Sequence, residues 1–478
     1  MKSTKKSRQR AGEIHRLYEF LAGGERAGWI TRSSTGHNFY LGEQLSAGER
    51  KRMRERLMPD YIINKMQPQI DLALYFCTAG RPAWRAVGVD GSDSAHAAMG
   101  SDVLQHISKV SRYTSVSSSV LRDAFTKGWG FFLVDVDPKA DEGRGEVIYT
   151  SVDPWDVYAD PASRDPLLTD AAYVLIAKQY TLEQVLRMMP QYAKQAKEAA
   201  QTRESMQMNF LNSSTSGQTA ELFGTEAVPD TVGPVDFDSL ASSYAADSTE
   251  QKYVKYFELY EKVAVPMVNL IIERQSVDPE SGEPMLALEQ MTMSAEEYGA
   301  LIKMDPGMQE LVRDISEWDK VRVVRTKSFG QTHIVEDREP LPGQDFPVVG
   351  IPWLHTGTVY PISMAWNMVG KQQEINKAHQ LMIHHAMLTA NFKYLVDERM
   401  VLDEEDWDRN ASKPGGRLKY RRGPNGEQPQ PVQPAPLNSA FYQIVQKAER
   451  DMEYLSGMSS GMMGQEDYSG REPYRGLL

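Results

Sequence analysis

The sequence predicts an α+β protein, and three features along the chain carry this prediction. Up to about residue 350, strand patterns that suit an antiparallel sheet alternate with helical patterns. Two long amphipathic helices follow, at about 361–392 and 437–457. Between these helices, acidic and basic side chains occupy separate halves of one insertion. The chain therefore has a mixed first part and a helical last quarter.

The composition narrows the class of protein. With 478 residues, 25% charged and 41% hydrophobic, the chain has an ordinary globular balance and is long enough for roughly two to four domains. The single cysteine, Cys77, excludes an internal disulfide framework and a cysteine zinc site, and it fits a reducing compartment. No apolar run reaches the roughly 18 residues of a membrane span. The basic start MKSTKKSRQR lacks the apolar region of a secretory signal, and we expect a solvated tail.

Helix and strand patterns divide the first part of the chain. Residues 47–76 predict a basic helix and then an apolar one, with Pro59 and Pro68 as breaks or kinks. Residues 115–137 predict a helix that ends near Gly128, followed by the strand FFLVDVD. The polar turn PKADEGRG joins this strand to a second one, GEVIYTSV, and the pair is expected to form a hairpin.

The middle of the chain mixes loops, strands and one helix. DPWDVYADPASRDP contains three Asp-Pro steps, which predict a rigid loop of several turns. The alternative is an acidic metal site, which is disfavoured because the carboxylates are not clustered at ligand spacing. Residues 203–250 are rich in Ser, Thr, Gly and Asp and predict a flexible insertion. KYVKYFELYEKVAV then predicts a half-exposed strand, SAEEYGALIKMDPGMQELVRDI a helix, and DKVRVVRTKSFGQTHIVED two more strands.

The first long helix carries amides along one side. It contains about 30 residues and is roughly 45 Å long. An apolar stripe consists of Ile375, Ala378, Met382, Ala386 and Ala390. A second, polar stripe consists of Gln373, Asn376, Gln380 and His384, and Gln372 adds a further amide in the first turns. Spacing alone indicates an ordinary bundle helix with a polar exposed side.

The insertion after this helix separates its charges. Residues 397–408 contain seven acids against only Arg399, whereas residues 409–422 contain six bases and no acid. PQPVQPAP then predicts a stiff extended tether. NSAFYQIVQKAERDMEYL predicts the second amphipathic helix, capped by Asn438. For a monomer, the simplest interpretation of the insertion is a solvated charged loop.

Five local patterns are informative together. They are NKMQPQIDLALYFCTAGRP, DAFTKGWGFFLVDVD, YTSVDPWDVYADPASRDPLLTDAAYV, GKQQEIN and SGMSSGMMGQEDYSG. In this order, over about 400 residues, they resemble the portal proteins of tailed double-stranded DNA phages, most like those of short-tailed phages. The matching positions are Asn64, Gly80, Pro82, Gly128, Gly130, Asp153, Pro154, Asp160, Pro161, Asp170, Gln372 and Asn376. Gly370 stands where the family usually has an Asp.

The resemblance implies a portal-like fold with three parts. These are an α/β wing domain at 1–360, stem helices at 361–392 and 437–457, and a small clip at 393–436, with a return to the wing at 458–478. Family members continue into a tunnel helix and a helical crown or barrel. Because this sequence stops at Leu478, we expect those parts to be absent or the chain to be cut short.

The resemblance also implies the function and the partners. The chain is expected to be a structural protein of a ring, a dodecamer, at the unique capsid vertex of the virion, assembled in the host cytoplasm. The ring would form the channel through which double-stranded DNA is packaged and ejected. Implied partners are the terminase large subunit, a head–tail adaptor, and the major capsid and scaffolding proteins, with no membrane.

In such a ring, one surface of each subunit meets a different surface of the next. We therefore expect a contact with the channel or a neighbouring subunit at Gln372, Gln373, Asn376, Gln380 and His384. In the clip, we expect contacts with a subunit, terminase or adaptor at Asp403, Glu404, Glu405, Asp406, Arg417, Lys419, Arg421 and Arg422.

No motif predicts catalysis. The sequence contains no GxxxxGK[ST] or HExxH, and the polar loop VDGSDSAH has no spacing that singles out a nucleophile. His379 and His384 do not share a helix face, which disfavours a metal site. We expect no catalytic residue, no cofactor and no metal.

The net charge of −12 disfavours a clamp on nucleic acid, because that binding depends on Lys and Arg. Twelve copies would carry about −144, and an acidic channel lets a duplex slide. The alternative function is a non-enzymatic oligomeric virion or scaffold protein that contacts DNA without forming a portal channel.

Overall fold

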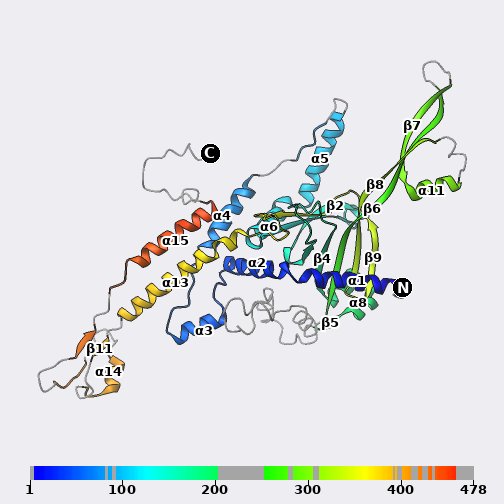
Figure 1. The fold of residues 1–478 in the computed structure, drawn as a ribbon. Coiled ribbons are helices and arrows are strands. Elements are labelled where there is room, and N and C mark those ends of the chain that lie inside the picture. Colours follow the sequence, from blue (N-terminus) through cyan, green and yellow to red (C-terminus); the bar gives the residue numbers. More distant parts are fainter. Residues whose placement is uncertain are drawn as a thin grey trace, which may run out of the picture. The chain divides into compact units, whose positions relative to one another are not determined.

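The computed structural model describes residues 5–80, 84–88, 93–202, 252–277, 284–304, 312–390, 393–395, 401–410, 418–422, 429–432 and 436–458 (Figure 1). The chain divides into two compact units. The first comprises Met1–Thr31, Trp84–Asp123 and Trp129–Pro361, and the second Arg32–Ala83, Ala124–Gly128 and Ile362–Leu478. Helices and antiparallel strands both contribute to the core, so the predicted α+β class is confirmed.

The first unit is built on two antiparallel sheets. The larger has the order β3 (Val157–Ala159), β4 (Tyr173–Thr181), β6 (Lys252–Val277), β8 (Val312–Phe329), β9 (His333–Pro340), with β5 (Gln201–Thr202) and β7 (Pro284–Ser294) also paired to β6. The smaller has the order β10 (Val348–Pro352), β1 (Trp129–Asp137), β2 (Glu146–Val152). Its helices are α1 (Lys5–Ala22), α5 (Ser94–Val110), α7 (Leu182–Met188), α8 (Ala193–Ala199) and α11 (Ala295–Met304). Two further helices, α2 (Glu25–Leu41) and α6 (Tyr113–Lys127), run from the first unit into the second.

The larger sheet is buried on both faces where β4 pairs with β6. On one face, Val174, Ile176 and Tyr260 pack with Phe131 and Leu133 of the smaller sheet. Side chains alternate along a strand, so the neighbouring residues point to the other face. There, β4 and β6 pack against Ala11, Ile14 and Leu21 of α1. The first unit therefore has a layer of sheet between a smaller sheet and a helix.

Three expectations for the first unit are corrected. Residues 5–10, expected in a solvated tail, lie in α1, where Arg10 pairs with Glu261 at 2.5 Å. The strand expected to be half exposed is the 26-residue β6, and its residues 254–260 are mostly buried because α1 covers their second face. The helix expected to run to Ile315 ends as α11, and β8 begins at Val312 and pairs with β6.

The hairpin and the glycines before it agree with the sequence. Strands β1 and β2 pair antiparallel, as predicted. Gly128 ends α6 with a φ of 99°, a conformation that side chains with a Cβ rarely adopt. At Gly130 a Cβ would lie 2.0 Å from the carbonyl oxygen of Val120, so only glycine lets α6 approach β1 this closely.

The Asp-Pro segment turns several times, as predicted, but its middle forms strand β3, which pairs with β4. Asp153 accepts a hydrogen bond from the N–H of Trp155, and Asp160 accepts from those of Ala162 and Ala172. These carboxylates hold their own backbone. Among the described residues, no group of three or more His, Cys, Asp or Glu side chains is arranged to hold a metal ion.

The second unit is mainly helical. Its elements are α3 (Ala47–Glu55), α4 (Met66–Ala79), α13 (Met364–Ala390), β11 (Lys393–Leu395), α14 (Glu404–Asn410), β12 (Gln430–Val432) and α15 (Ala440–Ser456). The long helices expected at 361–392 and 437–457 correspond to α13 and α15. Residues 32–83, expected in the wing, belong to this unit because α4 packs on both long helices. The predicted insertion at 203–250 and nearly all of 458–478 lie outside the described residues.

Candidate functional site: the long helices and the segment between them

Helices α13 and α15 form the centre of the second unit. Ile375 and Ala378 of α13 are buried, as are Val445, Ala448 and Met452 of α15. Burial of such apolar side chains is what holds two amphipathic helices together. The apolar stripe predicted from the sequence is therefore used within the chain, at least over its first half.

An ion pair joins the exposed sides of the two helices. Lys371 Nζ lies 2.8 Å from Asp451 Oδ2 and 3.0 Å from Glu374 Oε2. The hydrogen bonds to Asp451 and then to Glu374 raise the pKa of Lys371, and the bond from Lys371 lowers the pKa of Asp451. Exposed pairs of this kind contribute little to stability, so the pair mainly aligns the helices.

Buried amides form a network around Gln372, which is fully buried. Its Oε1 accepts hydrogen bonds from the backbone N–H groups of Lys65 and Met66, at 3.0 and 3.1 Å. Its Nε2 donates to the carbonyl oxygen of Ile63, at 2.7 Å, and to Asn376 Oδ1, at 3.0 Å. Lys65 and Met66 start α4, and Lys65 makes no side-chain cap of its own. Gln372 thus caps α4 from a distant part of the chain.

Two more amides of α13 extend this network. Asn376 Nδ2 donates to Gln44 Oε1 at 2.6 Å, and Gln380 Nε2 donates to the carbonyl oxygen of Tyr61 at 3.4 Å. Both are buried, 5% and 6% exposed. The side of α13 that was expected to face a channel or neighbour is therefore covered, at these three amides, by residues of the same chain.

The other two residues of the expected set differ from these amides. Gln373 is exposed. His384 is partly buried, and its Nδ1 has no hydrogen-bond partner. Only these two of the five residues are left with polar groups for a contact outside the chain.

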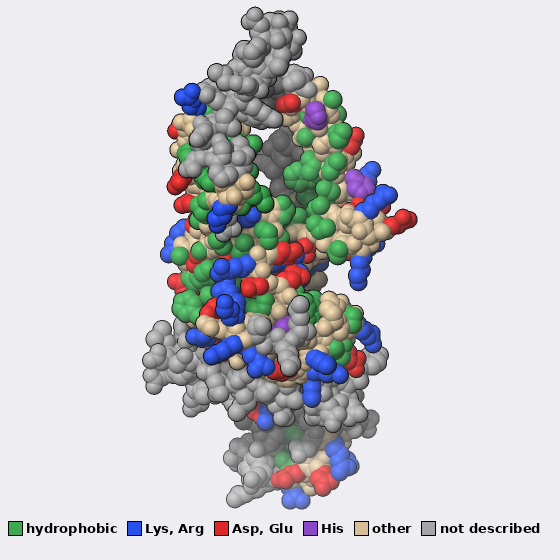
Figure 2. Space-filling view, turned by 90° about the vertical axis from the view of Figure 1, so that its right-hand side faces the viewer, with side chains coloured by type: hydrophobic (Ala, Val, Ile, Leu, Met, Phe, Trp, Pro, Cys, Tyr) green, Lys and Arg blue, Asp and Glu red, His purple; other side chains and the backbone are tan. Residues whose placement is uncertain are grey.

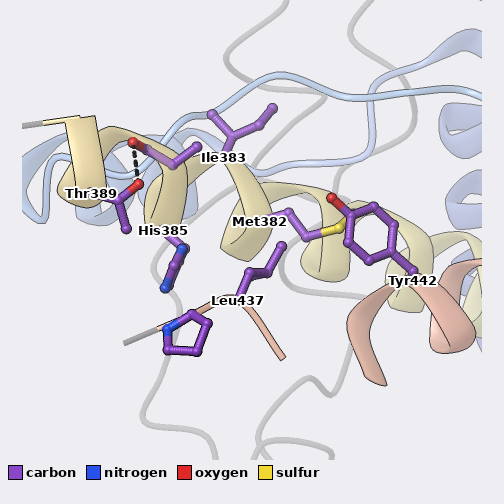
Figure 3. Close-up of a pocket in the computed structure, with 8 residues that line it drawn as sticks. Met382, Ile383, His385, Thr389, Leu437 and Tyr442 are labelled. Atoms are coloured by element: carbon purple, nitrogen blue, oxygen red, sulfur yellow. Dashed lines mark hydrogen bonds between the residues drawn. The ribbon is translucent and has the colours of Figure 1, made fainter. Parts of the chain in front are cut away.

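An open apolar groove lies at the far end of α13, where the helices separate. Its volume is about 610 Å³. Figure 3 shows Met382 and Ile383 of α13 with Leu437 and Tyr442 on the chain that begins α15. Thr389, also in the wall, is tied to its own helix by a 2.9 Å hydrogen bond to the carbonyl of Ala386. Tyr442 is 58% exposed, so this end of the pair has apolar surface for a further contact.

The described residues of the expected clip form a small fold. Strands β11 and β12 pair antiparallel and join its two ends. Trp407 of α14 is buried, and its Nε1 donates to the carbonyl oxygen of Lys419 at 2.8 Å. An isolated bridge pairs Val401 with Tyr420. The acidic and basic halves are therefore held together within one chain.

The clip charges point outward. Glu404, Glu405, Lys419, Arg421 and Arg422 are exposed. Asp403 is also exposed and its Oδ1 caps α14 by accepting from the N–H of Glu405, while Asp406 is partly buried and accepts from Asn410. No ion pair links acids 403–406 to Lys419, Arg421 or Arg422 in this described part of the chain. Arg417 lies outside the described residues.

Sequence reasoning missed the partners of the amides. Gln44 and the backbone at 61–66 are more than 300 residues from the amides that they meet, and no periodicity connects them. Ser456 Oγ similarly donates to Gln69 Oε1 at 3.0 Å. The signal available was indirect: amides in the middle of an apolar helix interface predict buried backbone groups that need partners.

Comparison with known proteins identifies the arrangement. The family model described as phage P22-like portal protein matches residues 25–472, which is most of the chain. No curated protein matches the sequence.

Proposed function

This chain belongs to the phage P22-like portal protein family, and on that premise we propose that it forms a channel for double-stranded DNA. The family is structural and non-enzymatic and acts as the phage head–tail connector. It implies a homo-oligomeric ring at a capsid vertex, in contact with capsid and DNA. We propose a ring of twelve copies that is used for both packaging and ejection.

The observation that carries this proposal is the pair α13 and α15 with its small fold between them. Gln372 joins α13 to the start of α4, and the hydrogen bond from Ser456 to Gln69 joins α15 to the same helix, so both long helices are fixed on α4. Such a pair suits a stem that must keep its position while DNA moves past it. Of the predicted stem contacts, Gln373 and His384 are the two that we retain for the channel or a neighbour.

The clip charges support a contact with a second protein. Asp403, Glu404, Glu405, Lys419, Arg421 and Arg422 are exposed in the described clip. We propose that they, with Asp406 and Arg417, meet the next subunit, the terminase large subunit or a head–tail adaptor. We propose that the apolar groove at Met382 and Tyr442 gives such a partner an uncharged anchor.

The charge of the molecule supports sliding of DNA. The chain carries −12, and on the face drawn in Figure 2 basic side chains lie among acidic and hydrophobic ones without forming one continuous basic field. Such a surface gives DNA few sites at which to stick. The sequence has no phosphate-binding loop, so a separate motor must supply the energy for packaging. Among the described residues, no helix has the length and apolar character of a membrane span.

Capsid and scaffolding proteins complete the proposed partners, and assembly is proposed to occur in the host cytoplasm. The test is the particle formed by the purified chain. Mass photometry and negative-stain images should show rings of about twelve copies. Monomers or dimers at all concentrations would contradict the ring. If capsids assembled without this protein still package DNA, the result would favour the non-channel virion protein.

A further inference from the structure

An apolar surface on the first unit is left uncovered. Helix α5 has no buried residue, although apolar side chains recur along one side of it at helical spacing. The β1–β2 hairpin likewise exposes valines beyond the part that α6 covers. Six side chains, each more than a third exposed, make up what we call the corner patch: Met99, Val103, Val110, Val134, Val136 and Val147.

The helix and hairpin parts of the corner patch adjoin. His106, on the same side of α5 as Val103 and Val110, contacts Glu146 at the start of β2, with 2.5 Å between Nε2 and Oε1. One turn later, Ser111 Oγ accepts from the N–H of Tyr149 at 3.1 Å. The valines at 136 and 147 are direct cross-strand partners and share one face of the hairpin.

The rim of the corner patch is acidic. Residues 135–146, which form the hairpin tip, contain five acids and two bases, a net charge of −3. Asp141 at the tip has a side chain 59% exposed. An exposed apolar surface with a polar rim is typical of a protein contact site, and here the rim calls for a basic partner.

Helix α3 of the second unit has the complementary properties. Residues 47–57 contain five bases and two acids, a net charge of +3 in a chain of −12. No residue of α3 is buried. Directly after it, Leu57 is 79% exposed and has a φ of 54°, a left-handed conformation that usually belongs to glycine at a helix end. A leucine there strains the backbone and gives its own unit no packing.

We propose that the corner patch of one copy receives the α3–Leu57 segment of a neighbouring copy. This contact rests on the ring proposed above. A ring contact joins two unlike surfaces of the same chain, and these two match in charge and in exposed apolar side chains. Duplex DNA is the other polyanion that a basic helix fits. The exposed Leu57 and the acids Glu49 and Glu55 within the segment favour a protein surface, since phosphate binding uses neither.

Charge exchange tests the pairing. One variant carries Arg50→Glu, Lys51→Glu and Arg52→Glu, and a second carries Asp137→Lys, Asp141→Lys and Glu142→Lys. Each variant alone should raise the protein concentration needed for half-maximal ring formation by roughly tenfold or more. The combined variant should bring this concentration most of the way back to the wild-type value. Lys194→Glu with Lys197→Glu, on the exposed side of α8, is the matched control and should assemble normally. Circular dichroism and thermal unfolding check that each variant is folded.

Leu57→Gly separates docking from structure. Glycine relieves the positive φ, so the variant should unfold no more easily than the wild type. If Leu57 anchors the neighbour, ring formation should nevertheless weaken; a purely structural leucine would leave it unchanged or improved.

The outcomes are distinct from those for the proposed function. If the wild type forms no ring, the proposed function fails and this contact with it. Rings that form normally from both charge variants overturn this contact alone. If the α3 charge variant forms normal rings but no longer retains DNA, α3 contacts DNA and the proposed contact between copies is also wrong. Two impaired variants without mutual rescue contradict the pairing.

Discussion

At the scale of single residues, Gln372 explains why a helix in an apolar interface carries amides. A helix start leaves backbone N–H groups without partners, and the loop before α4 adds an unpaired carbonyl. One glutamine side chain offers an acceptor and two donors and satisfies both needs. Asn376 and Gln380 do the same for Gln44 and Tyr61. The amide stripe thus fixes where α4 and its loop sit on α13.

Replacing Gln372 by Leu should destabilise the second unit. The change removes the partners of the N–H groups of Lys65 and Met66 and of the carbonyl of Ile63, in partly to fully buried surroundings, at a cost of about 2 kcal/mol in the free energy of unfolding. Urea unfolding measures it. Gln373→Leu, one position along and exposed, is the control and should change stability by less than about 0.5 kcal/mol. Equal losses in the two variants would refute the capping role.

The Asp-Pro loop contains a carboxylate that responds to pH. Hydrogen bonds from the hydroxyl of Ser163 and the N–H of Arg164 hold the pKa of Asp170 below its ordinary value of 3.8. A carboxylate with a lower pKa in the folded state stabilises the fold above its unfolded pKa. That contribution is lost as the pH falls from 3.8 through the lower folded value.

Asp170→Asn should therefore flatten the acid side of the stability curve. Asparagine has no proton to gain, so the variant should be less stable than the wild type at neutral pH and differ less from it at about pH 2. Urea midpoints across this range measure the effect. Asp165, whose pKa is also lowered, remains in both proteins and supplies the residual slope. A constant difference at every pH would contradict the ionic role.

At the scale of elements, the sequence predicted correctly those helix ends that are determined by neighbouring residues. Thr181 before α7 and Pro190 after it mark that helix correctly, because a cap and a proline act within one turn. The end of α11 was misjudged: GMQELVRDI has helical spacing, but residues from Val312 pair with β6, and strand pairing with a distant segment is not visible in local periodicity. The same limit applies to α1, whose burial depends on β4 and β6.

The clip is the element whose charges should matter in groups. Among its described residues, no ion pair links acids 403–406 to Lys419, Arg421 or Arg422, so these two groups do not neutralise one another within the chain. Single exposed pairs contribute about 0–1 kcal/mol, so only several together can set the register of a ring. We expect reversal of Arg417, Lys419, Arg421 and Arg422 to Glu to impair assembly, as seen by mass photometry.

Reversal of acids 403–406 to Lys in the same chain should partly restore assembly. Arg409→Ala is the control, since it removes only an exposed pair with Glu405 within α14. Rings that form normally from the four-Glu variant but fail to package DNA would assign the basic residues to terminase or an adaptor.

At the scale of the whole molecule, the division into units was only partly predictable. The break near residue 361 follows from the change in periodicity. Membership of residues 32–83 in the helical unit depends on Gln44 and α4 meeting α13, which are contacts between distant segments. Composition, by contrast, predicts those properties of the whole chain that do not depend on its fold, above all its net charge.

That charge makes a prediction about DNA. Affinity for duplex DNA comes mainly from Lys and Arg that displace counterions from phosphates, and each such contact steepens the dependence on salt. A chain of −12 with no groove-reading motif should bind linear duplex DNA weakly, without sequence preference, and with a shallow salt dependence. Fluorescence anisotropy between about 50 and 200 mM salt measures this. The Lys194→Glu, Lys197→Glu variant is the internal control: if α3 contacts protein, the α3 charge variant should lose no more DNA affinity per reversed charge than this control does. Nanomolar, sequence-dependent binding at about 150 mM salt would indicate that the protein clamps DNA and would contradict a channel through which DNA slides.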